Sequence, residues 1–424
     1  MAVMWVVFIL GILAKIPVAF VLLILSITYI LSEAMPMTVV AQRLASSVSG
    51  YTLIAVPLCI LAGEIMNTGG ITKRLFGLAM AIGGHIRGGL AHVNVLASMI
   101  FAGISGSSSA DAAGLGRIEI QAMMDEGYDR EFSAAITGIS SVIGPIIPPS
   151  IHLVLYSGIT DVSVAKLFAG GLIPGVIVGL SLMAFIYFRA VTGKEHCPVR
   201  PRESASGIWK AFKDSLFPML APVLILSGIL LGIVTATEAA ALAVVCCTIL
   251  AIAYREIRLS DVPRILQNTL VSTGVVMLIL AAGQLFAWVI TVERLPELFV
   301  EFVYSITRNR VAIILLLDAI MLLTGCFLPA TSGLLILTPI MVHIAKDLNI
   351  DLVHLGVWAI FGLTIGVVTP PVGASLYIVS DIAKVPMERL IKRSLPYYIP
   401  LIVALLLVSF IPALSTFLPN LLAK

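Results

Sequence analysis

Long stretches without a charged side chain decide what this sequence can fold into. Residues 167–188 form a run of 22 residues that contains no Asp, Glu, Lys or Arg, and the run 395–423 is longer still. About 20 apolar residues make one helical crossing of a bilayer, where a helix satisfies its own backbone hydrogen bonds. The chain is 59% hydrophobic and 12% charged, whereas a soluble domain carries roughly 25% charge. We therefore predict an all-α polytopic membrane protein.

Two blocks of the sequence repeat one another at a constant spacing. GPIIPPSIHLVLYSGITDVSVAKLFAGGLIP (144–174) aligns without a gap with GVVTPPVGASLYIVSDIAKVPMERLIKRSLP (366–396), 222 residues later. The same offset carries Gly103 onto Gly325. Each half places apolar segments before its block and one long apolar span at its end. The sequence therefore predicts a first repeat over 1–190, a connector over 191–214 and a second repeat over 215–424.

Each repeat contains a short apolar stretch that is interrupted by small and polar residues. In the first repeat, GISGSSSADAAG (103–114) separates two stretches of about 12 residues. A helix of that length spans roughly 18 Å, which is too short to cross a bilayer. Two half-length helices that meet at a polar tip are typical of a re-entrant hairpin. The sequence predicts hairpins at about 90–125 and 311–346, each followed by a helix broken at Pro-Pro, at about 131–160 and 353–383.

The distribution of charge predicts that the two repeats are inverted. The connector is rich in Lys and Arg, so the positive-inside rule makes it cytoplasmic. One span earlier, the loop 161–172 contains Lys166 as its only basic residue, so this loop is expected outside. Its repeat partner, 384–393, contains four basic residues and is expected inside. Equivalent loops of the two repeats are thus expected on opposite sides of the membrane.

The interrupted segments favour a function in binding. Lipid cannot hydrogen-bond to a backbone, so carbonyl groups released at a Pro-Pro break need partners inside the protein. Such carbonyls, together with serine hydroxyls, form an oxygen-rich site suited to Na⁺. The N-termini of half-helices carry partial positive charge, which suits a carboxylate. Inverted repeats with paired interrupted helices are typical of secondary transporters.

Several polar residues in apolar segments allow two interpretations. Asp111 follows the serine run and can cap a helix or contact a substrate. Glu64, Glu238 and Asp318 lie within apolar runs, where both ion coupling and polar packing between helices remain open. His152, just after the first Pro-Pro, fits a hydrogen-bonded structural histidine better than a substrate ligand.

These motifs carry a family resemblance. GISGSSSADAAGLG, GPIIPPS, the TATEAAA segment and TPPVGASLY resemble the large membrane subunit of TRAP (tripartite ATP-independent periplasmic) transporters, of the DctM/SiaM type, over essentially the whole chain. The resemblance implies an elevator-type, Na⁺-driven importer of an organic acid, such as sialic acid or a C4-dicarboxylate, in the bacterial inner membrane. It implies that the hairpins and broken helices move against a scaffold formed by the other spans.

The resemblance also implies two protein partners. One is a small four-helix membrane subunit, and the other is a periplasmic substrate-binding protein that delivers the acid. Because no extra helices precede the first repeat, we expect the small subunit to be a separate polypeptide.

Carried onto this sequence, the resemblance implies two Na⁺ sites and one site for the acid. The first Na⁺ would lie between the first tip and the first Pro-Pro, mostly on backbone carbonyls of Gly103, Ser105, Ser107, Gly144, Ile147 and Pro149. The second would lie at the equivalent place, near Gly325, Phe327, Gly366, Thr369 and Pro371. The second tip, GCFLPATSG, lacks the serine run, so carbonyls would contribute more there. The acid would lie between the tips, near Ser108, Ser109, Asp111, Thr331 and Ser332.

Three other functions fit the sequence less well. A stand-alone Na⁺/dicarboxylate symporter would use similar hairpins without a binding protein. A channel is disfavoured because no charged ring or filter sequence is present. An enzyme is not expected, because HExxH is missing and GISGS is not GxSxG. Nothing in the sequence indicates a nucleic-acid partner, and the identity of the organic acid stays open.

Overall fold

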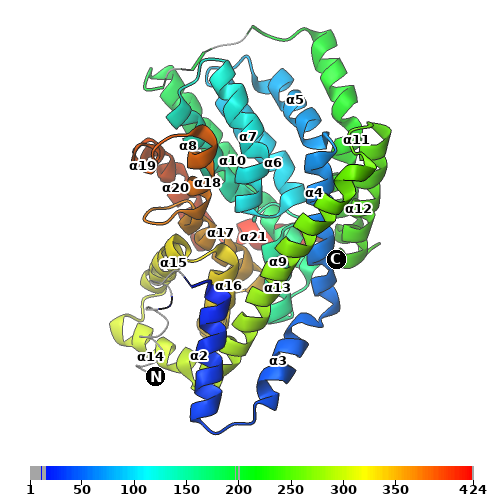
Figure 1. Cartoon of the computed structure of the whole chain (residues 1–424). Helices are drawn as coiled ribbons and strands as arrows, with labels where there is room; N and C mark the ends of the chain where they lie inside the picture. Colours follow the sequence, from blue (N-terminus) through cyan, green and yellow to red (C-terminus); the bar gives the residue numbers. More distant parts are fainter. Residues whose placement is uncertain (1–10, 12–15, 196, 199–200, 423–424) are drawn as a thin grey trace.

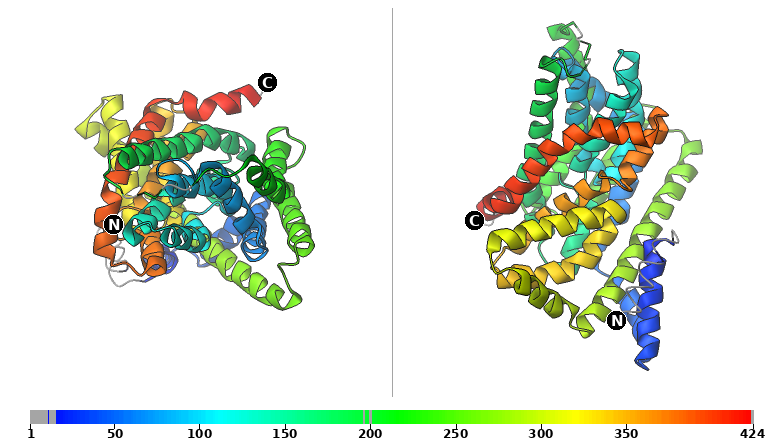
Figure 2. Two further views of the ribbon diagram at one scale, coloured as in Figure 1. Left: turned by 90° about the horizontal axis from the view of Figure 1, so that it is seen from above. Right: turned by 90° about the vertical axis from the view of Figure 1, so that its left-hand side faces the viewer.

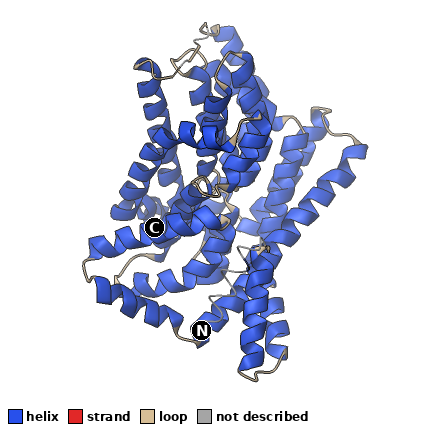
Figure 3. Ribbon diagram, turned by 60° about the vertical axis from the view of Figure 1, so that its left-hand side comes forward, coloured by secondary structure: helices blue, strands red, loops and turns tan. Residues whose placement is uncertain are grey.

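The computed structural model describes residues 11, 16–195, 197–198 and 201–422 (Figure 1). Over these ranges the ordered elements are α-helices and short 3₁₀ turns, and none of the residues described is in a strand (Figure 3). Six helical segments in these ranges are long and apolar enough to cross a membrane: Tyr51–Thr68, Val164–Val191, Ala236–Ala253, Leu259–Val292, Arg310–Phe327 and Met387–Phe410. The all-α polytopic architecture is therefore confirmed.

The described part before the connector forms nine helices and two 3₁₀ turns. They are α2 (Val18–Ser32), α3 (Thr38–Val48), η1 (Tyr51–Ile54), α4 (Ala55–Thr68), α5 (Ile71–Gly83), α6 (Gly89–Ser105), α7 (Ser108–Asp125), α8 (Arg130–Ser140), η2 (Ser141–Ile143), α9 (Ile151–Thr160) and α10 (Val164–Val191). Helices α6 and α7 occupy the range in which the first hairpin is expected, but the expected length of about 12 residues is wrong, because they have 17 and 18 residues. The helix α8 and the half-helix α9 flank the first Pro-Pro.

The described part after the connector contains the second hairpin, α15 and α16, and the second broken pair, α17 and α18. Its elements are α11 (Ala205–Leu230), α12 (Ala236–Ala253), η3 (Leu259–Asp261), α13 (Val262–Val292), α14 (Leu295–Ile306), α15 (Arg310–Phe327), α16 (Ala330–Asp347), α17 (Leu352–Val367), α18 (Ala374–Ala383), α19 (Met387–Ser394), η4 (Leu395–Tyr397), α20 (Tyr398–Phe410) and α21 (Ala413–Leu422). Helix α16 starts and ends 222 residues after α7. The peptide bonds Pro148–Pro149 and Pro370–Pro371 are both cis.

The hairpins pack on the half-helices of the opposite repeat. Helix α7 lies against α18, and helix α16 lies against α9. Helices α2 and α13 run side by side along one edge of the molecule (Figure 2), and α13 also packs on α3, α4 and α16. The four hairpin helices, α8, α9, α17 and α18 therefore form one packed unit that is flanked by longer helices.

The connector is fixed by a buried carboxylate at one end of the molecule. Glu195 is 5% exposed, and Arg189 of α10 donates to its Oε1 from Nη2 at 2.8 Å. Arg393 of α19 lies 2.6 Å from its Oε2, and the Tyr397 hydroxyl donates to Oε1 at 2.9 Å. The two basic segments that are expected inside thus lie at the same end.

The loop after α9 lies at the other end of α10. Helix α10 has 28 residues, so its two ends are about 42 Å apart at 1.5 Å per residue. The loop 161–163 precedes its first residue, whereas Arg189 and the Glu195 cluster are at its far end. Because Arg393 reaches that cluster, the loop 161–163 and its repeat partner near α19 lie at opposite ends. Inverted repeats require this arrangement.

Candidate functional site

The first hairpin tip and the first Pro-Pro break are in direct contact. Helix α6 ends at Gly106, whose φ of 59° favours glycine. A Cβ added to Gly106 would lie 3.0 Å from the carbonyl oxygen of Pro149 and 2.8 Å from the amide of Ile151. The carbonyl of Gly106 also lies 3.2 Å from Nδ1 of His152. Two irregular backbone segments, the predicted surroundings of the first cation, are therefore brought together.

Asp111 of α7 and Gly144 of the first break make a second contact between the tip and the break. Asp111 lies in the first turn of α7, where a carboxylate is favoured by the helix dipole, and it is 2% exposed. Its carboxylate contacts Gly144 so closely that a Cβ at this glycine would collide with Oδ2. Asp111 therefore faces the break from inside the protein.

The other residues predicted for the first cation site lie near the contact between Asp111 and Gly144. Ser107 caps α7 with extended backbone, and its hydroxyl is 3.2 Å from that of Ser109. Ile147 and Pro149 are buried in the break, and the Ile147 side chain packs on Gly175 of α10. Gly103 and Ser105 belong to the last turn of α6, and their side-chain surroundings lie outside the described features.

The second predicted cation site is built around a close helix crossing. A Cβ added to Gly366 of α17 would lie 2.5 Å from the Cα of Gly325 on α15. The Thr369 hydroxyl, two residues beyond the end of α17, donates to the carbonyl of Ile365 in the last turn of that helix at 2.6 Å. Phe327 is 52% exposed and Pro371 is exposed, so this break is more open than the first.

Hydroxyl contacts join the two repeats at the tips. The Ser108 hydroxyl on α7 lies 2.9 Å from that of Ser141 and 2.9 Å from that of Ser375 on α18. Ser108 and Ser375 are 267 residues apart in the sequence. The first tip is therefore tied to the break of the other repeat.

His152 makes the reciprocal contact. Its Nε2 lies 3.5 Å from the Thr331 hydroxyl on α16, while Nδ1 faces the Gly106 carbonyl. A carbonyl only accepts, so Nδ1 carries the proton and Nε2 accepts from the threonine. One imidazole, 6% exposed, thus bridges both hairpin tips. This agrees with the structural histidine that the sequence favoured.

The N-termini of four helices, two from the hairpins and two from the half-helices, meet at these contacts. Ser108 is the first residue of α7 and meets the second residue of α18, Ser375. His152 is the second residue of α9 and meets the second residue of α16, Thr331. Gly106 connects the two pairs, because it lies two residues before Ser108 and its carbonyl contacts His152. Free N–H groups and partial positive charge from four helices therefore gather in one place, which favours an anion.

The five predicted acid-site residues divide into two sets. Ser108, Asp111 and Ser332 are buried, and the Ser332 hydroxyl has no hydrogen-bond partner within the described ranges. Ser109 is exposed and Thr331 is half-buried. Only the latter two offer accessible hydroxyls in this conformation.

The three ambiguous carboxylates have separate explanations. Glu238 accepts from the Thr235 amide at 2.7 Å in a capping box at the start of α12. Glu64 accepts from Asn268 of α13 at 3.3 Å, and Asp318 accepts from the Trp358 indole at 2.6 Å. Polar packing describes Glu64 and Asp318. Glu238 fits neither interpretation. It belongs to a capping box, which the local T-x-x-E pattern of the sequence indicates.

Sequence reasoning missed a buried polar chain behind the first tip. Asn94 of α6 donates to the Thr137 hydroxyl at 2.6 Å and accepts from the Ser140 hydroxyl at 2.8 Å. Ser98 donates to Ser140 at 3.0 Å. Glu119 of α7 is 1% exposed, and neither carboxylate oxygen has a hydrogen-bond partner among the described residues. The available signal was the repeat itself, because Asn94, Ser98 and Glu119 align with apolar residues at the offset of 222.

Fold and site together define a membrane transport protein, and comparison with known proteins gives its family. Residues 5–414 match the tripartite ATP-independent periplasmic transporter family, DctM component. The chain is 37% identical over 410 residues to the sialic acid TRAP transporter large permease protein SiaM of Vibrio cholerae, covering 96% of each chain. It is 40% identical over 381 residues to the C4-dicarboxylate TRAP transporter large permease protein DctM of Pseudomonas aeruginosa, covering 90% of this chain and 89% of that protein.

A solved structure shares the fold. The crystal structure of the Alcanivorax borkumensis YdaH transporter matches with a TM-score of 0.63 at 15% identity, covering 87% of this chain and 86% of the other. The chain therefore belongs to the DctM family of large TRAP transporter permeases, and it is a multi-pass protein of the bacterial inner membrane.

Proposed function

We propose that this chain is the substrate-translocating subunit of a Na⁺-coupled importer of an organic acid. The observation that carries the proposal is the meeting of four helix N-termini around Gly106, Ser108 and His152. A carboxylate placed there would be stabilised without a charged ligand. The relatives named above transport a sialic acid and a C4-dicarboxylate, which supports this class of substrate.

Two Na⁺ ions would couple import to the sodium gradient. The first would bind where the tip meets the first break, at the six positions from Gly103 to Pro149 that the sequence predicts. The close approach of Gly106 to the Pro149 carbonyl supports this position. The second would bind near the Gly325–Gly366 crossing, through carbonyls and the oxygen of the Thr369 hydroxyl, which donates its proton to the Ile365 carbonyl and keeps its lone pairs for a cation.

An elevator movement would carry the acid across the membrane. The contacts Ser108–Ser375 and His152–Thr331 tie both hairpins and both half-helices together, so these elements can move as one body. The scaffold would comprise the flanking helices, including α2 and α13. It would hold a separate small four-helix subunit, and a periplasmic binding protein would deliver the acid.

Uptake into proteoliposomes tests the proposal. The purified chain is reconstituted with its small subunit, and labelled sialic acid or succinate is supplied with and without Na⁺ and binding protein. We expect uptake of one acid class that requires both. Uptake that needs no binding protein would instead identify a stand-alone symporter, and no uptake of either class would refute the proposal.

Two substitutions test the cation positions. Ser105→Ala and Thr369→Ala should each weaken the dependence of uptake on Na⁺ concentration. Thr416→Ala is a matched control, since its hydroxyl also bonds back to its own helix but lies at α21, away from the tips. An unchanged Na⁺ dependence in both test variants would show that these positions do not bind the ion.

The inverted topology has its own test. A cysteine introduced between residues 201 and 210 should react with a membrane-impermeant reagent only from the cytoplasmic side. Labelling from the periplasm would overturn the orientation.

A further inference from the structure

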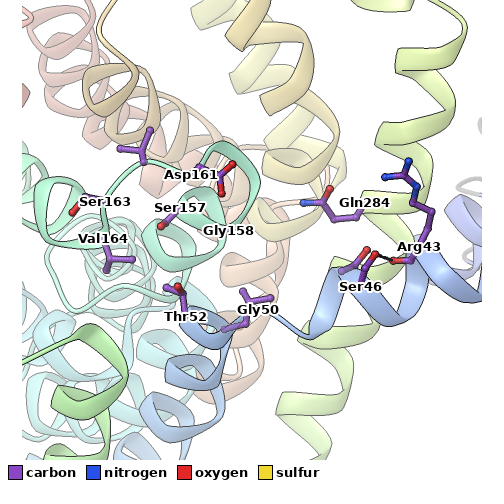
Figure 4. A pocket seen from close by; sticks show the side chains of 13 residues that line it. Arg43, Ser46, Gly50, Thr52, Ser157, Gly158, Asp161, Ser163, Val164 and Gln284 are labelled. Carbon is purple, nitrogen blue, oxygen red and sulfur yellow. Dashed lines mark hydrogen bonds between the residues drawn. The ribbon is translucent and has the colours of Figure 1, made fainter.

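A polar cavity lies between the flanking helices and the far end of α9. Its volume is about 500 Å³, within the roughly 300–1,000 Å³ of small-molecule sites. Arg43 of α3 and Gln284 of α13 line one side, and Ser157 and Asp161 line the other (Figure 4). Further hydroxyls come from Ser46, Ser47, Thr52 and Ser163.

The cavity is on the side of the molecule away from the connector. Asp161 directly follows α9 and lies close before α10, about 42 Å of helix away from the Glu195 cluster. Ser157 is five residues after His152 on α9, or roughly 8 Å along the helix axis. With the connector inside, the cavity opens toward the outside and adjoins the helix that leads to the hairpin tips.

The charges in the cavity favour one kind of ligand. Arg43 is exposed and makes no ion pair with the described residues; its guanidinium lies 5.3 Å from the centre of the Trp288 ring. An arginine fork binds a carboxylate through two parallel hydrogen bonds. Asp161 is the cavity's carboxylate, and it can accept from ligand hydroxyls but repels a second ligand carboxylate.

We propose that this cavity is an outer vestibule that binds a hydroxylated monocarboxylate, a sugar acid, before the acid reaches the hairpin tips. The carboxylate binds Arg43, and the hydroxyl groups bind Asp161, Gln284 and the surrounding serines. A C4-dicarboxylate fits poorly, because its second carboxylate would face Asp161. The proposal rests on the proposed function for its ligand class and narrows that class.

The arrangement also gives the vestibule a role in the transport cycle. Arg43 and Gln284 belong to α3 and α13, which pack on each other among the flanking helices. Ser157 and Asp161 belong to the end of α9, whose other end carries His152. An acid in the cavity would therefore contact both the scaffold and the moving body.

Binding and uptake measured on the same variants test the vestibule. The full chain with its small subunit is titrated calorimetrically with N-acetylneuraminate and with succinate, and uptake of both acids is followed in proteoliposomes. Arg43→Gln should weaken N-acetylneuraminate binding and raise the KM of uptake about tenfold or more, the effect of losing a hydrogen-bonded charge. The kcat should change less than about twofold, because the hairpin tips are untouched.

Asp161→Asn should act in opposite directions on the two acids. It should weaken the binding of N-acetylneuraminate, because an acceptor for its hydroxyl groups is lost. It should strengthen the binding of succinate, because the repulsion of its second carboxylate is removed. Arg308→Gln is the matched control, an exposed arginine outside the cavity without an ion pair in the described structure. It should leave both acids unchanged. Unaltered melting temperatures show that the variants remain folded.

The outcomes separate this proposal from the proposed function. Normal Na⁺-dependent uptake with unchanged KM values in both variants would overturn the vestibule and leave the function intact. Parallel effects of Asp161→Asn on the two acids would overturn the sugar-acid specificity. If wild-type protein transports neither acid and binds neither, the proposed function fails, and the vestibule fails with it.

Discussion

The two hairpins have the same backbone plan but different interiors. Behind the first tip, hydrogen bonds connect Asn94, Ser98, Thr137 and Ser140. The residues 222 positions later are Leu316, Ile320, Ala359 and Gly362. On the second hairpin, Asp318 instead accepts from the Trp358 indole at 2.6 Å.

This difference separates what positions the helices from what gives the site its chemistry. Both repeats break at Pro-Pro, and both join a hairpin to a half-helix of the other repeat. The residues of the first break, from Gly144 to Ser150, are all buried, whereas Thr369 and Pro370 are half-buried and Pro371 is exposed. A similar backbone plan therefore surrounds the two breaks with residues of different polarity and access.

The largest effect is expected at the helix crossing of the second repeat. Gly325→Ala places a Cβ 2.8 Å from the Cα of Gly366 and in collision with the Leu363 carbonyl. Backbone must move, so we expect a destabilisation of about 3 kcal/mol, measured as a lower melting temperature in detergent, and loss of uptake. Gly274→Ala is the control, because nothing lies within 4 Å of the added atom. Equal melting temperatures for both variants would contradict the close crossing.

A smaller effect is expected from the indole of the second repeat. Trp358→Phe removes the donor to Asp318 and leaves a buried carboxylate, at a cost of about 2 kcal/mol. Adding Asp318→Leu, the residue found at the aligned position 96, should restore most of the loss. If the double variant is less stable than Trp358→Phe alone, the pair does not act as a unit.

A smaller loss of stability is expected when polar residues behind the first tip are replaced by the residues found at the aligned positions of the second repeat. Asn94→Leu removes the amide donor to the Thr137 hydroxyl and one of the acceptors of the Ser140 hydroxyl, and should cost about 1.5 kcal/mol. Adding Ser98→Ile, Thr137→Ala and Ser140→Gly, which completes the pattern of the second repeat, should recover stability but not uptake. Full uptake in the quadruple variant would show that these polar residues have only a packing role.

The smallest effect is expected at Glu119, and it should be stabilising. Its carboxylate oxygens have no hydrogen-bond partners in the described structure. Glu119→Met installs the residue at the aligned position 341, so we expect a gain of about 1 kcal/mol in thermal unfolding. A loss of stability would indicate that the carboxyl has a partner in the native protein.

Local signals in the sequence predicted the elements that position the site. Glycine and Pro-Pro interrupt helices through their own local geometry, and Gly106 and both Pro-Pro pairs lie between helices in the structure. The T-x-x-E pattern at Thr235 indicates a capping box in the same way, although it was interpreted as an intramembrane acid. By contrast, the Asp318–Trp358 bond joins residues 40 apart and has no local signal.

The sequence by itself determined that this protein is helical and crosses the membrane, because lipid offers the backbone no hydrogen-bond partners. It also determined the family and the places where helices break, since glycine and proline act on their own neighbours. Only the tertiary structure decided that Ser108 meets Ser375, that His152 bridges both tips, and that Arg43 and Asp161 face one cavity. Those hydrogen bonds join residues from 46 to 267 positions apart, and they depend on how helices pack rather than on any pattern along the chain.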